Sequence, residues 1–91
     1  MVIINGKVYD EKTSELVLEC GNSQYTYDDH GNIRIHKTQK GNYFLVHRWW
    51  VSDCREIEEA FAGKDAIIRF LSRHKRGDLA GELFASELET A

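Results

Sequence analysis

The sequence contains no proline, no internal repeat and no low-complexity tract, so neither a fibrous nor a disordered chain is indicated. It has no apolar run approaching the roughly 20 residues that a membrane-spanning helix needs. The start of the chain lacks the basic segment and the long apolar segment of a signal peptide. We therefore expect a cytoplasmic protein that does not associate with a membrane.

Cysteine is also scarce. Cys20 and Cys54 are far apart and form no C-x-x-C pattern, so we expect two half-buried thiols and no disulfide in a reducing compartment. The histidines show neither H-x-x-x-H nor H-E-x-x-H spacing, so no metal ion or other cofactor is expected. Phosphate-cradling glycine loops and nucleophile elbows are missing as well, and we do not expect an enzyme.

The composition that remains is that of an ordinary globular protein with unevenly distributed charge. The 91 residues are 42% hydrophobic and 30% charged, which indicates a single domain over residues 1–91. The net charge is −3, yet residues 32–51 hold four basic side chains and no acid, and residues 52–68 are again acidic. These blocks can pair with one another in the fold, or present separate acidic and basic faces to a partner.

The first third of the chain reads as short strands. Asn5 and Gly6 are typical of a type I′ turn, because both of its central positions require positive φ. A loop or a single helical turn is expected over residues 10–14, where the sequence is polar. We predict strands over 2–4, 7–10 and 16–20, with a further short strand over 25–27 and a turn over 28–32.

A β-hairpin is predicted within residues 32–51, with its loop at 38–41. The hydrophobic pattern favours a register that pairs Ile35 with Phe44, because a slip of one residue would place His47 opposite Ile33. One face would then be apolar, with Ile33, Ile35, Phe44 and Val46. The opposite face would carry Arg34, His36, Tyr43, Leu45, His47 and Trp49.

Helices are predicted for the rest of the chain. Ser52 or Asp53 would cap a helix over 53–62, and Gly63 would end it. A second helix is expected over 65–75, and a third would begin with Asp78 as its cap. Strands thus precede helices, which predicts an α+β fold: an antiparallel sheet of three to five strands in the N-terminal half, packed against two or three C-terminal helices.

The hairpin is the strongest candidate for binding. Its basic and aromatic side chains can contact phosphates and stack on bases, or they can lie in the core if the helices cover them. If they are exposed, a protein partner is favoured, because Trp, Tyr and Arg dominate protein interfaces and the chain is acidic, with a pI near 5.8. The candidate partner-binding residues are Arg34, His36, Lys40, Tyr43, His47, Arg48 and Trp49 on the hairpin, and Glu56 and Glu59 on the acidic helix.

Three stretches resemble a loose set of small bacterial and phage-type proteins from mobile elements: residues 6–10 (GKVYD), Lys12-Thr13 and residues 36–45 (HKTQKGNYFL). Residues 70–84 resemble the same set more weakly. The members of that set typically carry a Gly-rich polar loop after the last stretch, where this chain has residues 47–50 (HRWW), so a function of that loop would not transfer.

The resemblance implies a phage or mobile-element protein acting in the cytoplasm of a bacterial host. We expect a non-enzymatic binding protein that inhibits or modulates a host protein or nucleoprotein complex, as an anti-CRISPR inhibitor does. Its acidic segments 53–59 and 82–89 could mimic nucleic-acid charge. The alternative is a small nucleic-acid-binding regulator that uses the basic aromatic hairpin 32–51.

Overall fold

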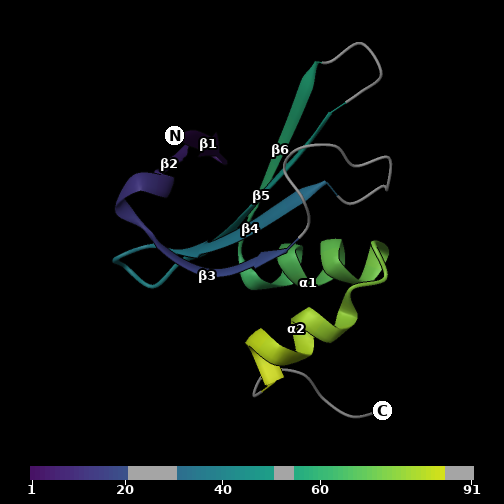
Figure 1. The fold of residues 1–91 in the computed structure, drawn as a ribbon. Helices are drawn as coiled ribbons and strands as arrows, with labels where there is room; N and C mark the ends of the chain where they lie inside the picture. Colours follow the sequence, from purple (N-terminus) through teal and green to yellow (C-terminus); the bar gives the residue numbers. More distant parts are fainter. Residues whose placement is uncertain (21–30, 51–54, 86–91) are drawn as a thin grey trace.

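The structure, a computed structural model, describes residues 1–20, 31–50 and 55–85, except for the side chain of Trp50 (Figure 1). A two-stranded sheet comprises β1 (Val2–Ile4) and β2 (Lys7–Tyr9), and a four-stranded antiparallel sheet has the order β3 (Glu15–Cys20), β4 (Asn32–Lys37), β5 (Tyr43–Trp50), β6 (Glu56–Ala62). Helices α1 (Lys64–Arg73) and α2 (Gly77–Phe84) follow. The predicted α+β fold is confirmed. The predicted strand over 25–27 lies outside the described residues.

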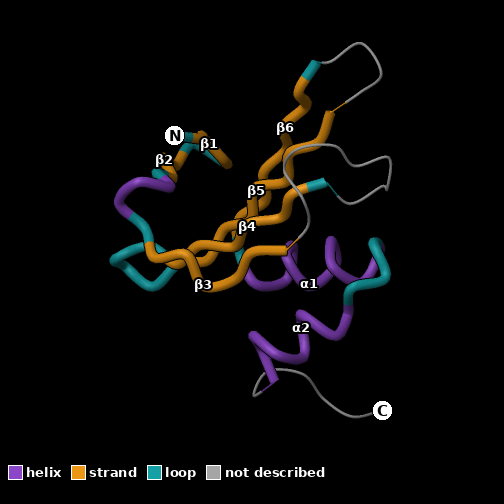
Figure 2. Tube along the Cα trace, viewed as in Figure 1, coloured by secondary structure: helices purple, strands orange, loops and turns teal. Residues whose placement is uncertain are grey.

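The four-stranded sheet is covered on both faces (Figure 2). On one face, α1 and α2 form the main core, which comprises Ile33, Ile35, Leu45, Ile67, Phe70, Leu71, Leu79, Ala80 and Phe84. On the other face, the β1–β2 hairpin forms a smaller cluster around Tyr9, Phe44 and Val46. We call these the helix face and the hairpin face of the sheet, and the hairpin in this name is β1–β2.

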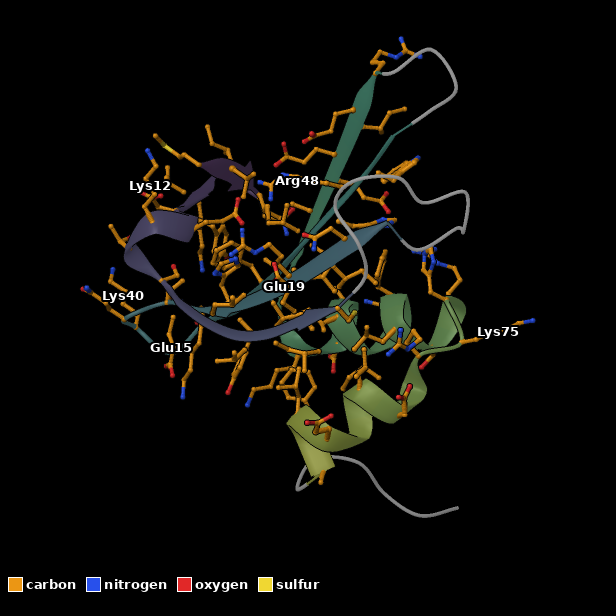
Figure 3. The ribbon with its side chains drawn as sticks, viewed as in Figure 1. Lys12, Glu15, Glu19, Lys40, Arg48 and Lys75 are labelled. Carbon is orange, nitrogen blue, oxygen red and sulfur yellow. The ribbon has the colours of Figure 1, made fainter. Side chains whose placement is uncertain are left out.

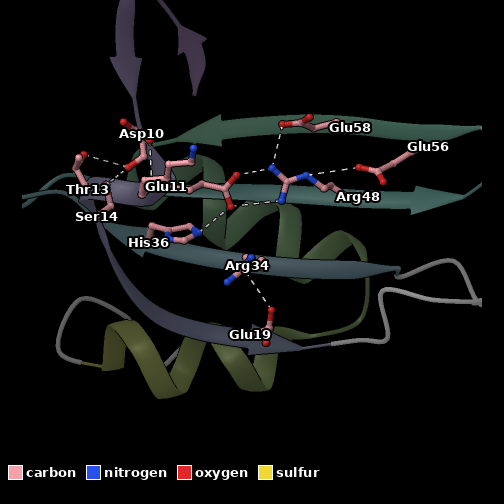
Figure 4. A network of polar contacts seen from close by, with 11 residues as sticks. Asp10, Glu11, Thr13, Ser14, Glu19, Arg34, His36, Arg48, Glu56 and Glu58 are labelled. Atoms are coloured by element: carbon pink, nitrogen blue, oxygen red, sulfur yellow. Dashed lines mark hydrogen bonds and ion pairs between the residues drawn. The ribbon is translucent and has the colours of Figure 1, made fainter.

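The β1–β2 hairpin forms as predicted, with positive φ at Asn5 (52°) and Gly6 (77°). The polar segment after it is a single turn of 3-10 helix, η1 (Glu11–Thr13). Its start is fixed by Asp10, whose carboxylate accepts a 3.0 Å hydrogen bond from the backbone N–H of Lys12. This turn carries Glu11 to the hairpin face of the sheet (Figure 4).

The β4–β5 hairpin lies where it was predicted, but the predicted register is wrong by one residue. Ile35 pairs with Leu45, and Ile33 pairs with His47, which is the pairing that the hydrophobic pattern disfavoured. The loop is five residues long, because the backbone N–H of Thr38 donates a 2.8 Å hydrogen bond to the Asn42 carbonyl. This extra residue shifts the second strand relative to the first.

The predicted apolar face is therefore split between the two faces of the sheet. All four of its members are fully buried, but Ile33 and Ile35 lie on the helix face whereas Phe44 and Val46 lie on the hairpin face. The prediction assumed that only one face is covered. Because both faces are covered, consecutive residues of the central strands are buried and alternation no longer selects a register.

The predicted helix over 53–62 is also wrong where the structure describes it, since Glu56–Ala62 form the edge strand β6. The i, i+3, i+4 spacing of Ile57, Ala60 and Phe61 fits a helix locally. Pairing with β5 overrides it, because it places Glu58 opposite Arg48 and extends the sheet. The predicted caps at positions 52 and 53 lie outside the described residues.

The two remaining predicted helices are present with shifted ends. α1 begins at Lys64, and α2 begins at Gly77 with Arg76 at the N-cap, so Asp78 lies in the first turn and is not the cap. Neither helix is long and apolar enough to cross a membrane, and the same holds for every helix in the described part of the chain.

Candidate functional site

A network of polar side chains lies on the hairpin face, centred on Glu11 (Figure 4). The Oε2 atom of Glu11 lies 3.1 Å from Nε2 of His36 and accepts a 3.3 Å hydrogen bond from Nη1 of Arg48. A second Arg48 nitrogen, Nη2, donates to the other oxygen of Glu11. Arg48 also lies near Glu56 and Glu58 on β6, with N–O distances of 3.7 and 3.4 Å. The Glu11 network thus ties η1 to strands β4, β5 and β6.

Within the Glu11 network, the pKa values of Glu11, Arg48 and His36 are shifted by their surroundings. The hydrogen bond from Arg48 lowers the pKa of Glu11 below its ordinary value, and the same bond raises the pKa of Arg48. Burial lowers the pKa of His36, whose ring stacks on Phe44 at a centroid distance of 5.0 Å. A neutral His36 donates its Nε2–H to Glu11, since a carboxylate only accepts. Nδ1 of His36 is then a buried acceptor with no hydrogen-bond partner in the described residues.

His47 belongs to the opposite side of the sheet and to the core. It is 2% exposed on the helix face, where Nδ1 lies 3.0 Å from Oε1 of Glu59. Its ring stacks on Trp49 at 4.5 Å and contacts Phe70 at 5.1 Å. His36 and His47 therefore do not share a face, and the prediction that they do is wrong.

The arginines of the strands have acidic partners. Arg34 forms an ion pair with Glu19 on β3, with Nε and Oε2 3.0 Å apart, and Arg48 is held in the Glu11 network. Arg34 and Arg48 thus do not present an uncompensated basic face. This compensation counts against the alternative in which Arg34 and Arg48 contact a nucleic acid.

The structure does bring together several predicted residues that were expected in different elements. Trp49 pairs with Ile57 on β6, Arg48 faces Glu58, and neither Trp49 nor Trp50 has a partner on β4. This end of β5 and β6 extends away from the helices and beyond β3 (Figure 1). We call Arg48, Trp49, Glu56, Ile57 and Glu58 the β5–β6 arm. Glu56 belongs to it through strand pairing and not through a helix.

Lys40 and Tyr43 lie at the other end of the sheet, around the β4–β5 turn. Three shallow hollows of about 760, 580 and 830 Å³ surround this turn. Their lining includes a group of cations that we call the basic track: Lys7, Lys37, Lys40, Lys64 and Arg69.

Of the basic track, only Lys40 was singled out from the sequence. A signal was available, because Lys7, Lys40 and Lys64 each stand next to a turn glycine: Gly6, Gly41 and Gly63. Gly6 lies in the β1–β2 turn, Gly41 in the β4–β5 turn and Gly63 between β6 and α1, so lysines beside these connections can converge even though they are far apart in sequence.

Within the described residues, no group of three or more His, Cys, Asp or Glu side chains could hold a metal ion. Cys20 is half-buried, and burial raises the pKa of its thiol. Cys54 lies outside the described residues. No protein-family model, curated protein or solved structure matches the chain.

Proposed function

We propose that this protein is a non-enzymatic binding protein of a phage or mobile element that inhibits or modulates a host protein or nucleoprotein complex, in the manner of an anti-CRISPR inhibitor. Its mobile-element origin rests on the sequence resemblance. The binding surface we assign to it is the β5–β6 arm, and the observation that carries this assignment is the presentation of Trp49 and Arg48 beside exposed acids on an edge strand.

The arm combines the features of a protein-binding surface. Trp and Arg are enriched among the residues that dominate interface energetics, and here they occupy neighbouring positions on opposite faces of one strand. Trp49 lies beside the half-buried Ile57, so the helix-side surface of the arm is apolar. The other surface carries Arg48 between Glu56 and Glu58, whose side chains are about two-fifths exposed. A partner with an apolar groove rimmed by basic side chains fits both surfaces.

The proposal is tested by capturing partners in a bacterial host that carries an active CRISPR system. Tagged protein should retain a defined effector protein after nuclease treatment, and its expression should raise the plating efficiency of a targeted phage. The double variant Glu56→Arg/Glu58→Arg should lose both effects, because it reverses the charge of the arm at exposed positions. Glu82→Arg reverses the charge of an exposed acid on α2, is the control for charge reversal outside the arm, and should retain both.

The opposite results would overturn the proposal. One is loss of every captured protein on nuclease treatment, which would indicate that partners are bridged by nucleic acid. Another is equal behaviour of the arm variant and the α2 control, which would remove the arm from the interaction.

A further inference from the structure

We propose that the basic track around the β4–β5 turn binds the sugar–phosphate backbone of a single-stranded nucleic acid. This inference goes beyond the proposed function, because it concerns the end of the sheet opposite the β5–β6 arm and does not depend on a protein partner. Its residues come from β2, from the β4–β5 hairpin and from α1.

The basic track is positive although the chain as a whole is negative. Six cationic side chains and only three acidic ones line the three hollows, whereas the net charge of the whole chain is −3. Of the three acids, Asp10 already accepts a hydrogen bond from the backbone of Lys12. A local excess of one charge in a concave surface concentrates counter-ions of the opposite sign.

Four of the five cations of the track are also uncompensated. In the part of the chain that the structure describes, Lys7, Lys37, Lys40 and Arg69 form no ion pair with a carboxylate, whereas Arg34, Arg48 and Arg76 each do. Lys37 and Lys64 place their Nζ atoms 5.6 and 5.5 Å from the centroid of the Tyr43 ring. Tyr43 packs edge-on against Phe84 in the core, so it anchors two ammonium groups beside the hollows.

The arrangement of the hollows favours a polymer over a small anion. The first and second hollows share Lys7, Tyr9 and Asn42, and the second and third share Thr38, Gln39 and Lys40 among others. The three hollows therefore adjoin one another around the β4–β5 turn, from α1, past β2, to η1 and β3. A single phosphate would occupy one hollow, whereas successive phosphates of a chain can contact cations in all three.

A single strand fits this path better than a duplex does. The track bends around the β4–β5 turn, and a flexible strand can follow such a bend at little cost, whereas a duplex of this length behaves as a stiff rod. Asn42 and Gln39 line the same hollows as the cations, and their amides offer donors and acceptors to exposed bases. Charged grooves of this kind bind single strands with little sequence preference.

The test measures the binding of purified protein to a fluorescein-labelled 20-nucleotide single strand by fluorescence anisotropy. With about four phosphate contacts, affinity should fall on the order of 50-fold between 50 and 200 mM salt. Lys7→Gln/Lys40→Gln should weaken binding on the order of 10-fold and flatten the salt dependence. The control Arg73→Gln/Lys75→Gln removes the same charge at exposed positions elsewhere, and should bind as the wild type does. Figure 3 shows Lys40 and Lys75 at opposite ends of the molecule.

Several results would overturn the proposal. Absence of binding at 50 mM salt, or equal weakening by both double variants, would show that the track is not a site. Tighter binding to a duplex of the same length would overturn the choice of a single strand. Competition by millimolar inorganic phosphate alone, or binding to phosphatidylserine vesicles without binding to the oligonucleotide, would replace the polymer with a smaller anion or a lipid surface. Because no host protein is present, none of these outcomes bears on the β5–β6 arm.

Discussion

The two ends of the four-stranded sheet differ in whether their cations have acidic partners and in how closely their glycines are packed. At the arm end, Arg48 is surrounded by carboxylates, and the backbone of Gly31 packs so closely against β5 that an added Cβ would lie 2.3 Å from the Arg48 carbonyl oxygen. At the turn end, Lys7 and Lys40 have no acidic partner in the described residues, and a Cβ on Gly41 would meet nothing within 4 Å.

This difference separates cations that already have carboxylate partners within the fold from cations that remain available to an anionic ligand. A cation that already has a carboxylate neighbour must give up that contact before it can bind an anion. An uncompensated cation remains free to attract an anion, but its repulsion from neighbouring cations lowers the stability of the folded protein. The contrast between the ends of the sheet can therefore be measured as opposite responses to substitution.

The largest effect is expected at Gly31. Gly31→Ala forces a residue with a side chain into positive φ (55°) and drives its Cβ into the backbone of β5, so it should lower the free energy of unfolding by about 3 kcal/mol. Gly41→Ala is the matched control, because Gly41 also has positive φ but open space around it, and should cost about 1 kcal/mol. Urea denaturation measures both. Equal losses would show that the arm end is no more tightly packed than the turn end.

The next effect is expected at the centre of the Glu11 network. Glu11→Ala removes the hydrogen bonds to Arg48 and His36, and should lower the free energy of unfolding by about 2 kcal/mol, the usual range for bonds to charged groups. Glu15→Ala removes an exposed acid near the turn end that forms no ion pair in the described residues, and should change it by less than about 0.5 kcal/mol. A loss of similar size in both variants would mean that the network contributes nothing specific.

Local signals in the sequence were enough to predict most of the helices and strands. Asn5-Gly6 identified the first hairpin, the polar residues after it identified η1, and the amphipathic pattern of residues 65–75 identified α1 within two residues at each end. Each of these signals acts over a few neighbouring residues, so no knowledge of the tertiary structure was needed.

The register of the β4–β5 hairpin and the nature of residues 56–62 depend on long-range contacts. The run of Phe44, Leu45 and Val46, all fully buried, is typical of a strand covered on both faces, and it could have warned that alternation would not select the register. For β6, the spacing of Ile57 and Phe61 fits a helix, and the segment forms a strand because it pairs with β5. The same limit applies to the sites, because Lys7 and Arg69 are far apart in sequence and line the same hollow only in the folded chain.

Acid should reduce the contribution of the Glu11 network to stability in two steps. His36 has a lowered pKa in the folded protein, so the unfolded state binds more protons below pH 6.5, and stability falls as pH falls from there. Glu11 also has a lowered pKa, and its contribution is lost below pH 4.5. Denaturation midpoints between pH 7.5 and 5.5 should therefore fall more for wild type than for His36→Gln, which keeps a donor for Glu11. A larger fall in the variant would reverse the assigned sign.

The smallest effect is expected at the turn end, and its sign distinguishes the two ends most clearly. Lys40 is exposed and has no acidic partner in the described residues, so Lys40→Gln removes repulsion from neighbouring lysines without breaking a contact. The free energy of unfolding should stay level or rise by a few tenths of a kcal/mol at low salt, and the gain should vanish at about 1 M salt, where the screening length is about 3 Å. A loss of more than about 0.5 kcal/mol would show that Lys40 is held by a favourable contact. The turn end would then be compensated like the arm end, and the charge available to an anionic strand would be smaller by one.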